Sequence, residues 1–446
     1  MNLKYLPLLF VLLLLGPGCN LEELNVNPND PTDVPLETLL PPAEKALMDF
    51  LAGDAAGISG IFSNYFQGIE NRFLPVETYA VDRDFLMRPI WEDLYVDALT
   101  TLSLIIQKSE DDSPHYAGIG RILMAIAMST ASDVWGDLPY KEAFRGPGVL
   151  APDFQRQDEI YVLMISGINT AITELEKPES LFTPGNDDLF FGGDVSAWKK
   201  VAYSLRARLS MRQVYRDNAL LGDILPLINK GIQSRDEALV YNYNEQEFNP
   251  WYQFQTSTPY LQIDDDFADL LDNDPRESAL IKSSFGEKLI GPYIASDNAP
   301  VYLITYEEMH FLEAEYYWRS NMIPEAETSL RLAVAEHISR VTEGLADPME
   351  VQDYLDSNCI VISGQAGLST IMNQKYIANF PSIEGWTDFR RTGFPNLTPN
   401  PGGSSVDNPN GEIPLRFPYP LNEVLYNPNV PTPQPDLQTP VWWDID

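Results

Sequence analysis

The stretch that decides the fold is Thr305–His337, TYEEMHFLEAEYYWRSNMIPEAETSLRLAVAEH. Its first half, Met309–Tyr317, carries apolar residues at three- and four-residue spacing, which predicts an amphipathic helix. Ser320–Met322 then predicts a turn, and Pro324 stands where the first turn of a second helix tolerates proline. Small residues that allow close helix approach occur at Ala314, Ala326 and Ala333. The stretch is therefore predicted to form a helical hairpin similar to a tetratricopeptide unit.

The same helical periodicity recurs along much of the chain. It is found at 39–66, 90–107, 115–132, 159–176, 195–216 and 220–233. Further hairpins can be drawn for 90–132 and 159–216, although no strict 34-residue repeat is visible. Long stretches rich in Pro, Gly and Asn separate the helices, at 20–38, 70–89, 241–262, 284–303 and 393–440. We therefore predict an all-α fold of tetratricopeptide-like hairpins whose long irregular loops are candidates for function.

The segment from Phe394 to Asp446 differs in kind, because prolines recur every few residues and little helical period remains. Proline fixes an extended backbone and removes a hydrogen-bond donor. The aromatic residues between the prolines are too many to leave in water; they are Phe417, Tyr419, Tyr426, Trp442 and Trp443. The pattern predicts an ordered, Pro-rich C-terminal coat over the helices. A disordered tail is the alternative.

The N-terminus has the pattern of a secretion signal. Lys4 precedes an apolar run, Tyr5–Leu15, that is too short to span a bilayer. A cysteine, Cys19, follows the small residues at the expected cut. This predicts a lipoprotein signal peptide over residues 1–18, a lipid on Cys19 and a single large domain over 19–446. The acidic pair Glu22-Glu23 resembles an export tag for the cell surface. The alternative is an ordinary secreted protein with a chance cysteine.

Composition indicates a large folded domain and excludes several classes of partner. The apolar share of 44% and the aromatic share of 11% exclude a disordered chain. The net charge of −36 argues against nucleic acid or anionic lipid as partners, since both need clustered Lys and Arg. Cys359 is the only cysteine besides Cys19, so no disulfide is expected if Cys19 is acylated. No second long apolar run appears in the sequence, so the membrane is expected to be reached through the lipid alone.

No motif in the chain points to catalysis or to a cofactor. The histidines His115, His310 and His337 lack a second histidine at metal spacing. Nucleophile elbows, phosphate loops and dinucleotide fingerprints are missing from the sequence. Carboxylate pairs exist among 65 acids, but nothing singles out two for glycoside hydrolysis. Asp264–Asp266 and Asp272–Asp274 could hold Ca²⁺, yet neither has the EF-hand spacing, and helix capping is the favoured explanation.

Two loops combine aromatic with polar side chains, which is the composition of a ligand-binding surface. They are 65–79 and 249–260. Sugar rings stack on Trp and Tyr while Asn, Gln and Arg bond the hydroxyls, and the same surface can hold a peptide. For each residue the alternative role is burial under its own loop. The candidates are Tyr65, Gln67, Arg72, Tyr79, Trp251, Tyr252 and Tyr260.

Short motifs in a fixed order give the chain a family resemblance. They are Asn25–Thr32, Asp133–Tyr140, Trp198–Arg212, Asn273–Arg276, Thr305–Glu315, Gln374–Phe380, Trp386–Pro395, Arg416–Pro420 and Trp442–Asp444. Each is weak alone, but the ordered set is specific. The chain resembles the SusD/RagB family of nutrient-binding outer-membrane lipoproteins, in its SusD-like branch. The resemblance implies a helical fold whose loops form the ligand face. It also implies a partner, a TonB-dependent outer-membrane transporter over which the lipoprotein sits as a lid facing the exterior.

Several of these motifs are interpreted as structural. Asp133–Tyr140 is predicted to end a helix at Gly136. The residues expected to lock a loop onto the core by stacking and bidentate pairing are Trp386, Asp388, Arg390 and Arg391. One helix carries Arg206, Arg208 and Arg212, which are expected to pair with buried acids such as Glu313 or Glu315.

The predicted function is capture of a glycan or oligopeptide and its delivery to a transporter, without chemistry. Two alternatives remain open at this point. One is a glycan-degrading surface enzyme, and the other is a helical assembly scaffold without a small ligand.

Overall fold

The hairpin predicted from Thr305–His337 is present in the computed structural model, as α15 (Tyr306–Arg319) and α16 (Ile323–Val341). The Thr305 hydroxyl caps α15 by accepting a hydrogen bond from the Glu308 amide at 3.2 Å. Pro324 lies in the first turn of α16. The small side chains predicted to allow close approach, Ala314, Ala326 and Ala333, are fully buried in one hydrophobic cluster.

The structure describes residues 34–244, 246–256 and 260–445. The predicted signal peptide, Cys19 and the Glu22-Glu23 pair lie outside these residues. Leu36–Asp446 forms one compact unit.

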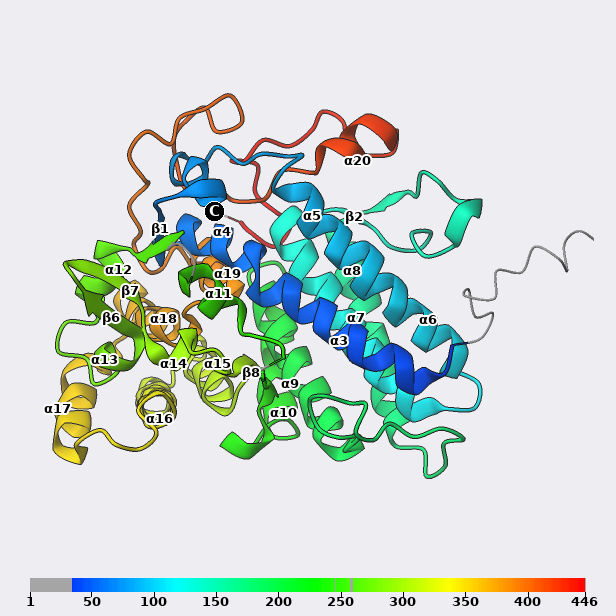
Figure 1. The fold of residues 1–446 in the computed structure, drawn as a ribbon. Helices are drawn as coiled ribbons and strands as arrows, with labels where there is room; N and C mark the ends of the chain where they lie inside the picture. Colours follow the sequence, from blue (N-terminus) through cyan, green and yellow to red (C-terminus); the bar gives the residue numbers. More distant parts are fainter. Residues whose placement is uncertain (1–33, 245, 257–259, 446) are drawn as a thin grey trace, which may run out of the picture. The chain divides into compact units, whose positions relative to one another are not determined.

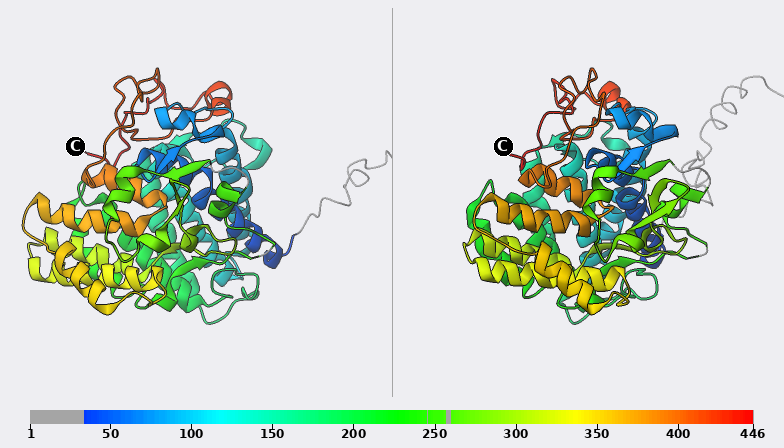
Figure 2. Two further views of the ribbon diagram at one scale, coloured as in Figure 1. Left: turned by 60° about the vertical axis from the view of Figure 1, so that its left-hand side comes forward. Right: turned by 90° about the vertical axis from the view of Figure 1, so that its left-hand side faces the viewer.

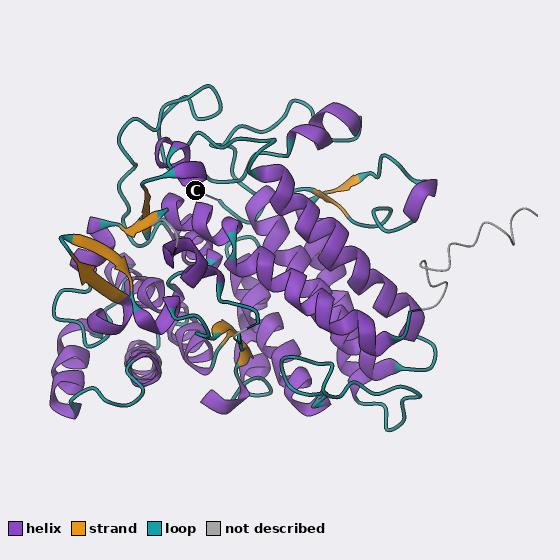
Figure 3. Cartoon of the chain, in the orientation of Figure 1, coloured by secondary structure: helices purple, strands orange, loops and turns teal. Residues whose placement is uncertain are grey.

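Helices dominate the described chain (Figure 1, Figure 3). Besides α15 and α16 they are α3 (Leu36–Ala52), α4 (Asp54–Phe62), α5 (Met87–Glu92), α6 (Thr100–Ser109), α7 (Pro114–Trp135), α8 (Gln157–Leu175), α9 (Val195–Gln213), α10 (Leu221–Ile228), α11 (Pro250–Thr256), α12 (Asp265–Leu270), α13 (Glu277–Leu280), α14 (Pro292–Ala295), α17 (Pro348–Asn358), α18 (Gln365–Asn379), α19 (Ile383–Thr392) and α20 (Leu421–Tyr426). A π-helical turn, Asp93–Leu99, joins α5 to α6. Every segment predicted from periodicity contains a helix. As predicted, α7 ends at Gly136, whose φ of 86° favours glycine.

The prediction of an all-α fold was too narrow, because short antiparallel strand pairs join the loops (Figure 3). They are β1 (Phe66–Gly68) with β5 (Leu261–Ile263), β2 (Leu138–Pro139) with β3 (Phe154–Gln155), β4 (Leu239–Tyr241) with β8 (Val301–Ile304), and β6 (Ile281–Ser284) with β7 (Glu287–Ile290). Strands of two to four residues are too short to show an alternating pattern in the sequence.

The helices pack as neighbours along the chain. α7 lies between α6 and α8, α8 packs on α9, and α3 runs along α6 (Figure 1). The α15–α16 hairpin packs against α10 and α18. None of the helices in the described part of the chain is long and apolar enough to cross a membrane.

The motif at Trp386–Pro395 was predicted to be a loop, but it lies mostly in helix α19, so the predicted backbone conformation was wrong. The predicted pairing of its charged side chains is confirmed. The Arg391 guanidinium bonds both Glu315 oxygens at 2.6 and 2.7 Å and Asp388 at 2.9 Å. The Arg390 guanidinium lies 3.6 Å from the centre of the Trp386 ring. The helix was missed because its buried face carries charged residues, which are rare in the core of a helical fold.

Two of the three arginines of α9, Arg208 and Arg212, do pair with acids, but not with those predicted. Arg208 binds Glu308 through two bonds of 2.6 Å. Arg212 pairs with Asp133 and Glu384. The predicted acids are used elsewhere: Glu313 binds His310 and Glu315 binds Arg319 and Arg391, while Arg206 donates to Asn169.

The segment after Gly393 is irregular apart from α20, and it lies over α4, α5 and α7 (Figure 1, Figure 2). Phe417 is fully buried, and its amide donates to the Val134 carbonyl at 2.6 Å. The Trp443 indole donates to Asp133 at 2.6 Å. Tyr419 is also buried, but Tyr426 is 80% exposed and Trp442 half-buried, so the expectation that all five aromatic residues are sheltered was wrong for Tyr426.

Candidate ligand-binding site

The two loops singled out from their composition meet in the structure. β1 pairs with β5, so that Gln67 lies opposite Gln262 and Phe66 opposite Ile263. Residues that are almost two hundred positions apart in the sequence thereby share one small sheet, beside α4 and α11 (Figure 1). The contact between these loops is a feature that composition alone did not reveal.

Arg72 holds the loops together. Its Nε and Nη2 donate to the same Asp54 oxygen at 3.0 and 2.7 Å. Its guanidinium also lies over three rings, at 5.1 Å from Phe73, 5.6 Å from Phe254 and 5.3 Å from Tyr260. A planar cation satisfies both kinds of contact at once. Arg72 therefore links the 65–79 loop to α11 and to the segment that follows it.

An acidic hollow of about 230 Å³ lies next to this clamp. Carboxylates enter it from three elements, as Asp49 of α3, Asp54 of α4 and Asp93 of the π-helical turn. Its other wall is α11, through Gln253 and Phe254. Burial, followed by the charge of Asp49, raises the pKa of Asp93. Asp49 is paired with Lys45 and Asp54 with Arg72. Among the described residues no cluster of His, Cys, Asp and Glu has metal-binding geometry.

Besides Arg72, three of the predicted ligand residues keep a partly open side chain, namely Gln67, Tyr252 and Tyr260. Tyr252 packs at 5.6 Å against Phe248, which is exposed. Together with Arg72 they form the surface that we call the Arg72 face: Gln67, Arg72, Tyr252 and Tyr260, with the acidic hollow beside them.

Tyr65 and Tyr79 belong to the core, which corrects their prediction as ligand residues. Both are 0% exposed. The Tyr65 hydroxyl donates to the Tyr376 carbonyl at 2.6 Å, and the two rings stack at 4.3 Å. The Tyr79 hydroxyl accepts from the Asn400 amide at 2.7 Å, and burial raises its pKa to about 12. A ring enclosed on both faces offers no surface to a sugar.

Trp251 is also closed from solvent, with 2% exposure, which excludes the predicted open stacking platform. Its ring packs on Phe66 at 5.3 Å and on Phe254 at 5.5 Å. Asn249 caps this helix by accepting from the Trp251 amide at 2.7 Å. Trp251 instead forms a wall of a second hollow.

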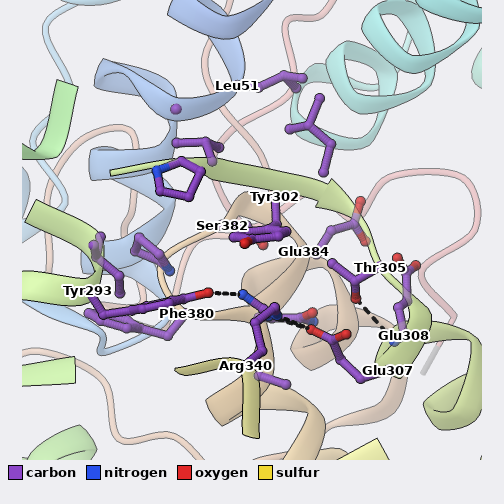
Figure 4. Close-up of a pocket in the computed structure, with 18 of the residues that line it drawn as sticks. Leu51, Tyr293, Tyr302, Thr305, Glu307, Glu308, Arg340, Phe380, Ser382 and Glu384 are labelled. Atoms are coloured by element: carbon purple, nitrogen blue, oxygen red, sulfur yellow. Dashed lines mark hydrogen bonds and ion pairs between the residues drawn. The ribbon is translucent and has the colours of Figure 1, made fainter. Parts of the chain in front are cut away.

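This second hollow, the Trp251 hollow, was not predicted from the sequence (Figure 4). It has a volume of about 100 Å³ and lies between α11, α14, β8, the first turn of α15 and the α18–α19 junction. Figure 4 shows Arg340 of α16 between the Tyr293 hydroxyl and Glu307, to which its Nε donates at 2.7 Å. The hollow draws on residues from 51 to 384, and no local signal could have assembled them.

The acidic pairs considered for Ca²⁺ have other roles. Asp264 caps α12 by accepting from the Asp266 amide at 2.8 Å. Asp274 bonds the Arg276 side chain at 2.8 and 2.6 Å in the core. Cys359 is buried, and burial raises the pKa of its thiol to about 12, which blunts it as a nucleophile.

Comparison with known proteins identifies relatives. Residues 28–297 and 283–420 match a family model, SusD-like_2, described as "Starch-binding associating with outer membrane". A SusD/RagB family protein from Bacteroides thetaiotaomicron has a similar structure, with a TM-score of 0.78 at 24% identity over 92% of this chain and 99% of that one. A chitin-binding SusD homolog from Flavobacterium johnsoniae gives 0.76 at 22% identity over 92% and 99%. No curated protein matches the chain.

Proposed function

Since the chain belongs to the SusD-like family of non-catalytic binding proteins associated with the outer membrane, we propose that it captures a glycan on the Arg72 face. A glycan needs rings to stack on and acceptors for its hydroxyls. The match of the family model over most of the chain makes glycan binding the expected role, and the site geometry suggests where it occurs.

The observation that carries the choice of face is the Arg72 clamp. It gathers Tyr260 and Phe254 around one guanidinium, and Asp54, its ion-pair partner, opens into the acidic hollow. Aromatic rings and carboxylate oxygens are therefore fixed within reach of one bound molecule. Since the clamp is made before a ligand arrives, little ordering is required on binding.

An oligopeptide is the second candidate ligand, favoured by the acidity of the hollow. Asp49 and Asp54 are already paired with Lys45 and Arg72, so it is the carboxylate of Asp93 that is left to attract a Lys or Arg side chain. The two ligands differ in how salt should affect their affinity. Added ions screen the attraction of a cationic peptide, but they do not screen the stacking of a neutral sugar.

We further propose that the protein is tethered by a lipid on Cys19 and passes its ligand to a TonB-dependent transporter. The support comes from the sequence, in the signal-like residues 1–18 and the family resemblance. Surface display facing the exterior belongs to the same proposal.

The test is calorimetric titration of purified protein, made soluble by Cys19→Ala, with a panel of neutral glycans and tryptic peptides. The Tyr252→Ala and Tyr260→Ala variants are compared with Tyr426→Ala, which removes an exposed ring far along the chain on α20. Loss of binding in the first two alone supports the Arg72 face. Equal binding by all variants contradicts that choice. If no ligand binds, even in the presence of the transporter, the scaffold alternative is favoured.

A further inference from the structure

The most exposed large apolar side chain in the described part of the chain is Phe285. It stands at the tip of the β6–β7 hairpin, where Phe285 and Gly286 form a two-residue turn between the paired residues Ser284 and Glu287. Both turn residues have a positive φ, of 51° and 89°, as in a type I′ turn. The hairpin thus holds an aromatic ring out in the solvent.

The backbone of this turn disfavours the residue that occupies it. The left-handed region is open to glycine and tolerated by Asn and Asp, but it is strained for a bulky side chain. Two-residue turns of this type therefore prefer Asn-Gly or Asp-Gly. Asparagine in place of Phe285 would relax the turn and leave no apolar ring on the surface. Phe285 is thus unfavourable to the hairpin itself, which points to a role outside the stability of the fold.

The rest of the hairpin is held firmly, so the ring is carried on a rigid support. Ile281 and Ile290 pair at its base, and both are buried. β7 packs on β5 and on α11. Close to the tip, the Lys288 ammonium pairs with Asp265 of α12 at 2.8 Å. A side chain presented on such a support loses little freedom when a bound molecule covers it.

This hairpin adjoins the Arg72 face, since it lies beside α12 and close to the β1–β5 pair (Figure 1). Gln67 belongs to the Arg72 face and lies opposite Gln262 of β5. Three residues farther along the chain, Asp265 pairs with Lys288 of the hairpin. Three residues of extended chain cover about 10 Å. The Arg72 face and the foot of the Phe285 turn are therefore separated by roughly that distance.

We infer that Phe285 is a second contact for a ligand held on the Arg72 face, and that only an extended chain reaches both. The inference rests on the proposed function for the first contact, and it adds a preference for long ligands over short ones. A short ligand occupies the Arg72 face alone, whereas a longer one passes the start of α12 and covers the Phe285 ring. The second contact then forms at a high effective concentration, so affinity rises with length while the first contact is unchanged.

A second protein is the other class of partner that could cover this ring. The neighbours of Phe285 in the hairpin argue against it, because Lys282, Ser283 and Glu287 are polar and exposed. The core of a protein interface is a contiguous apolar patch depleted of charge. A single ring among polar side chains is suited to one unit of a chain-like ligand.

The experiment measures affinity against ligand length, by calorimetry with the soluble Cys19→Ala protein. The probes are α-1,4-linked glucans and N-acetylglucosamine oligomers of two to eight units, since the family model and a structural relative are described as binding starch and chitin. Phe285→Asn removes the ring and relaxes the turn. It should weaken binding of the longest chain by about ten- to a hundredfold, if the ring stacks as rings do on bases. The affinity for the shortest oligomer that binds should stay within twofold. Phe285→Tyr keeps a ring and should retain the preference for long chains.

Phe182→Asn is the matched control, because it removes a partly exposed ring beside Ser113, at the start of α7, and should change no affinity. The melting temperature of Phe285→Asn should equal or exceed that of the wild type. A lower value would show that the ring supports the fold, and it would overturn the inference. Equal affinities of Phe285→Asn and the wild type at every length would overturn it as well. If long chains bind and depend on Tyr252 and Tyr260 but not on Phe285, only this inference fails. If no chain binds, the proposed function fails with it.

Discussion

Trp251 and Phe254 lie one turn apart on α11 with their rings edge to face at 5.5 Å, and each lines a different hollow. Both rings are buried, and they lie between the two hollows. Neighbouring aromatic residues in one short sequence therefore have different roles, and substitutions should separate them.

The first prediction contrasts Trp251→Ala with Tyr252→Ala. Trp251 is buried against Phe66 and Phe254, so its loss should lower the free energy of unfolding by about 3–5 kcal/mol. Tyr252 is half-buried, and its loss should weaken ligand binding by about ten- to a hundredfold, if stacking on a ring contributes about 1–3 kcal/mol as it does for bases. Urea denaturation and calorimetry measure the two effects. A stable Trp251→Ala protein that no longer binds would reverse the assignment.

The second prediction concerns the Arg72 clamp. Arg72→Lys keeps the charge but loses the planar group that bonds Asp54 and covers Tyr260. We expect faster amide hydrogen exchange in β1 and β5 and weaker ligand binding, with the melting temperature lowered only slightly. Arg88→Lys, in an exposed ion pair with Asp84, serves as control. Unchanged exchange in the Arg72 variant would show that the clamp does not hold the loops.

The third prediction concerns α19. Trp386 is fully buried, donates to the Pro414 carbonyl at 2.9 Å and carries the Arg390 guanidinium on its face. Trp386→Ala should lower the free energy of unfolding by about 3–5 kcal/mol. Ligand affinity, measured at a temperature where the variant is folded, should stay within twofold. Abolished binding with a normal melting temperature would make α19 part of the ligand site.

The fourth prediction is a pH dependence at Glu44 of α3. Burial, followed by the charge of Asp188, raises its pKa well above the usual value, and its Oε1 atom has no hydrogen-bond partner. Because the pKa of Glu44 is raised in the folded state, its contribution to stability is fully present when the pH is below the ordinary carboxyl pKa. That contribution falls as the pH rises toward the folded-state pKa. Glu44→Gln should therefore raise the melting temperature at pH 8 more than at pH 4. Glu37→Gln, an exposed position on the same helix, is the control that isolates the effect of burial. If Glu44→Gln shifts the melting temperature equally at pH 4 and pH 8, the prediction is wrong.

The contribution of Glu315 to stability should depend on pH in the opposite direction. Arg391 and Arg319 hold its pKa at about 2, despite burial. Its contribution to stability is present above the ordinary carboxyl pKa and is lost as pH falls toward 2. Glu315→Gln should therefore remove part of the acid sensitivity of the protein and, by leaving Arg391 poorly paired, lower stability at pH 7 by about 3–5 kcal/mol. Thermal melts between pH 2 and pH 7 measure both.

The last prediction concerns the tether. Cys19→Ala should release the protein from membrane fractions, because a multiply acylated cysteine anchors firmly and alanine cannot be acylated in its place. Immunoblots of membrane and soluble fractions test this. Retention of the variant in the membrane would show that another attachment exists.

The sequence predicted the long helices and the end of α7, because helical periodicity and the backbone freedom of glycine depend only on residues that are close in the sequence. It missed α19 because Asp388, Arg390 and Arg391 replace apolar residues on the buried face. It found the loops of the Arg72 face but ranked Trp251, Tyr65 and Tyr79 as ligand residues, because nothing local separates a buried ring from an exposed one. The acids that pair with the α9 arginines, Glu308 and Glu384, are fixed only by tertiary packing.

The bond between Trp443 and Asp133 spans 310 positions of the chain. During synthesis Asp133 must wait for 310 further residues before this partner arrives. Loop-closure entropy rises only slowly with such a length, but contacts this distant slow folding. Until that moment the buried ends of α7 and α19 lack their cover and present large aromatic surfaces to chaperones and proteases. A message cut short before residue 443 should therefore yield a product that is degraded, not a smaller working protein.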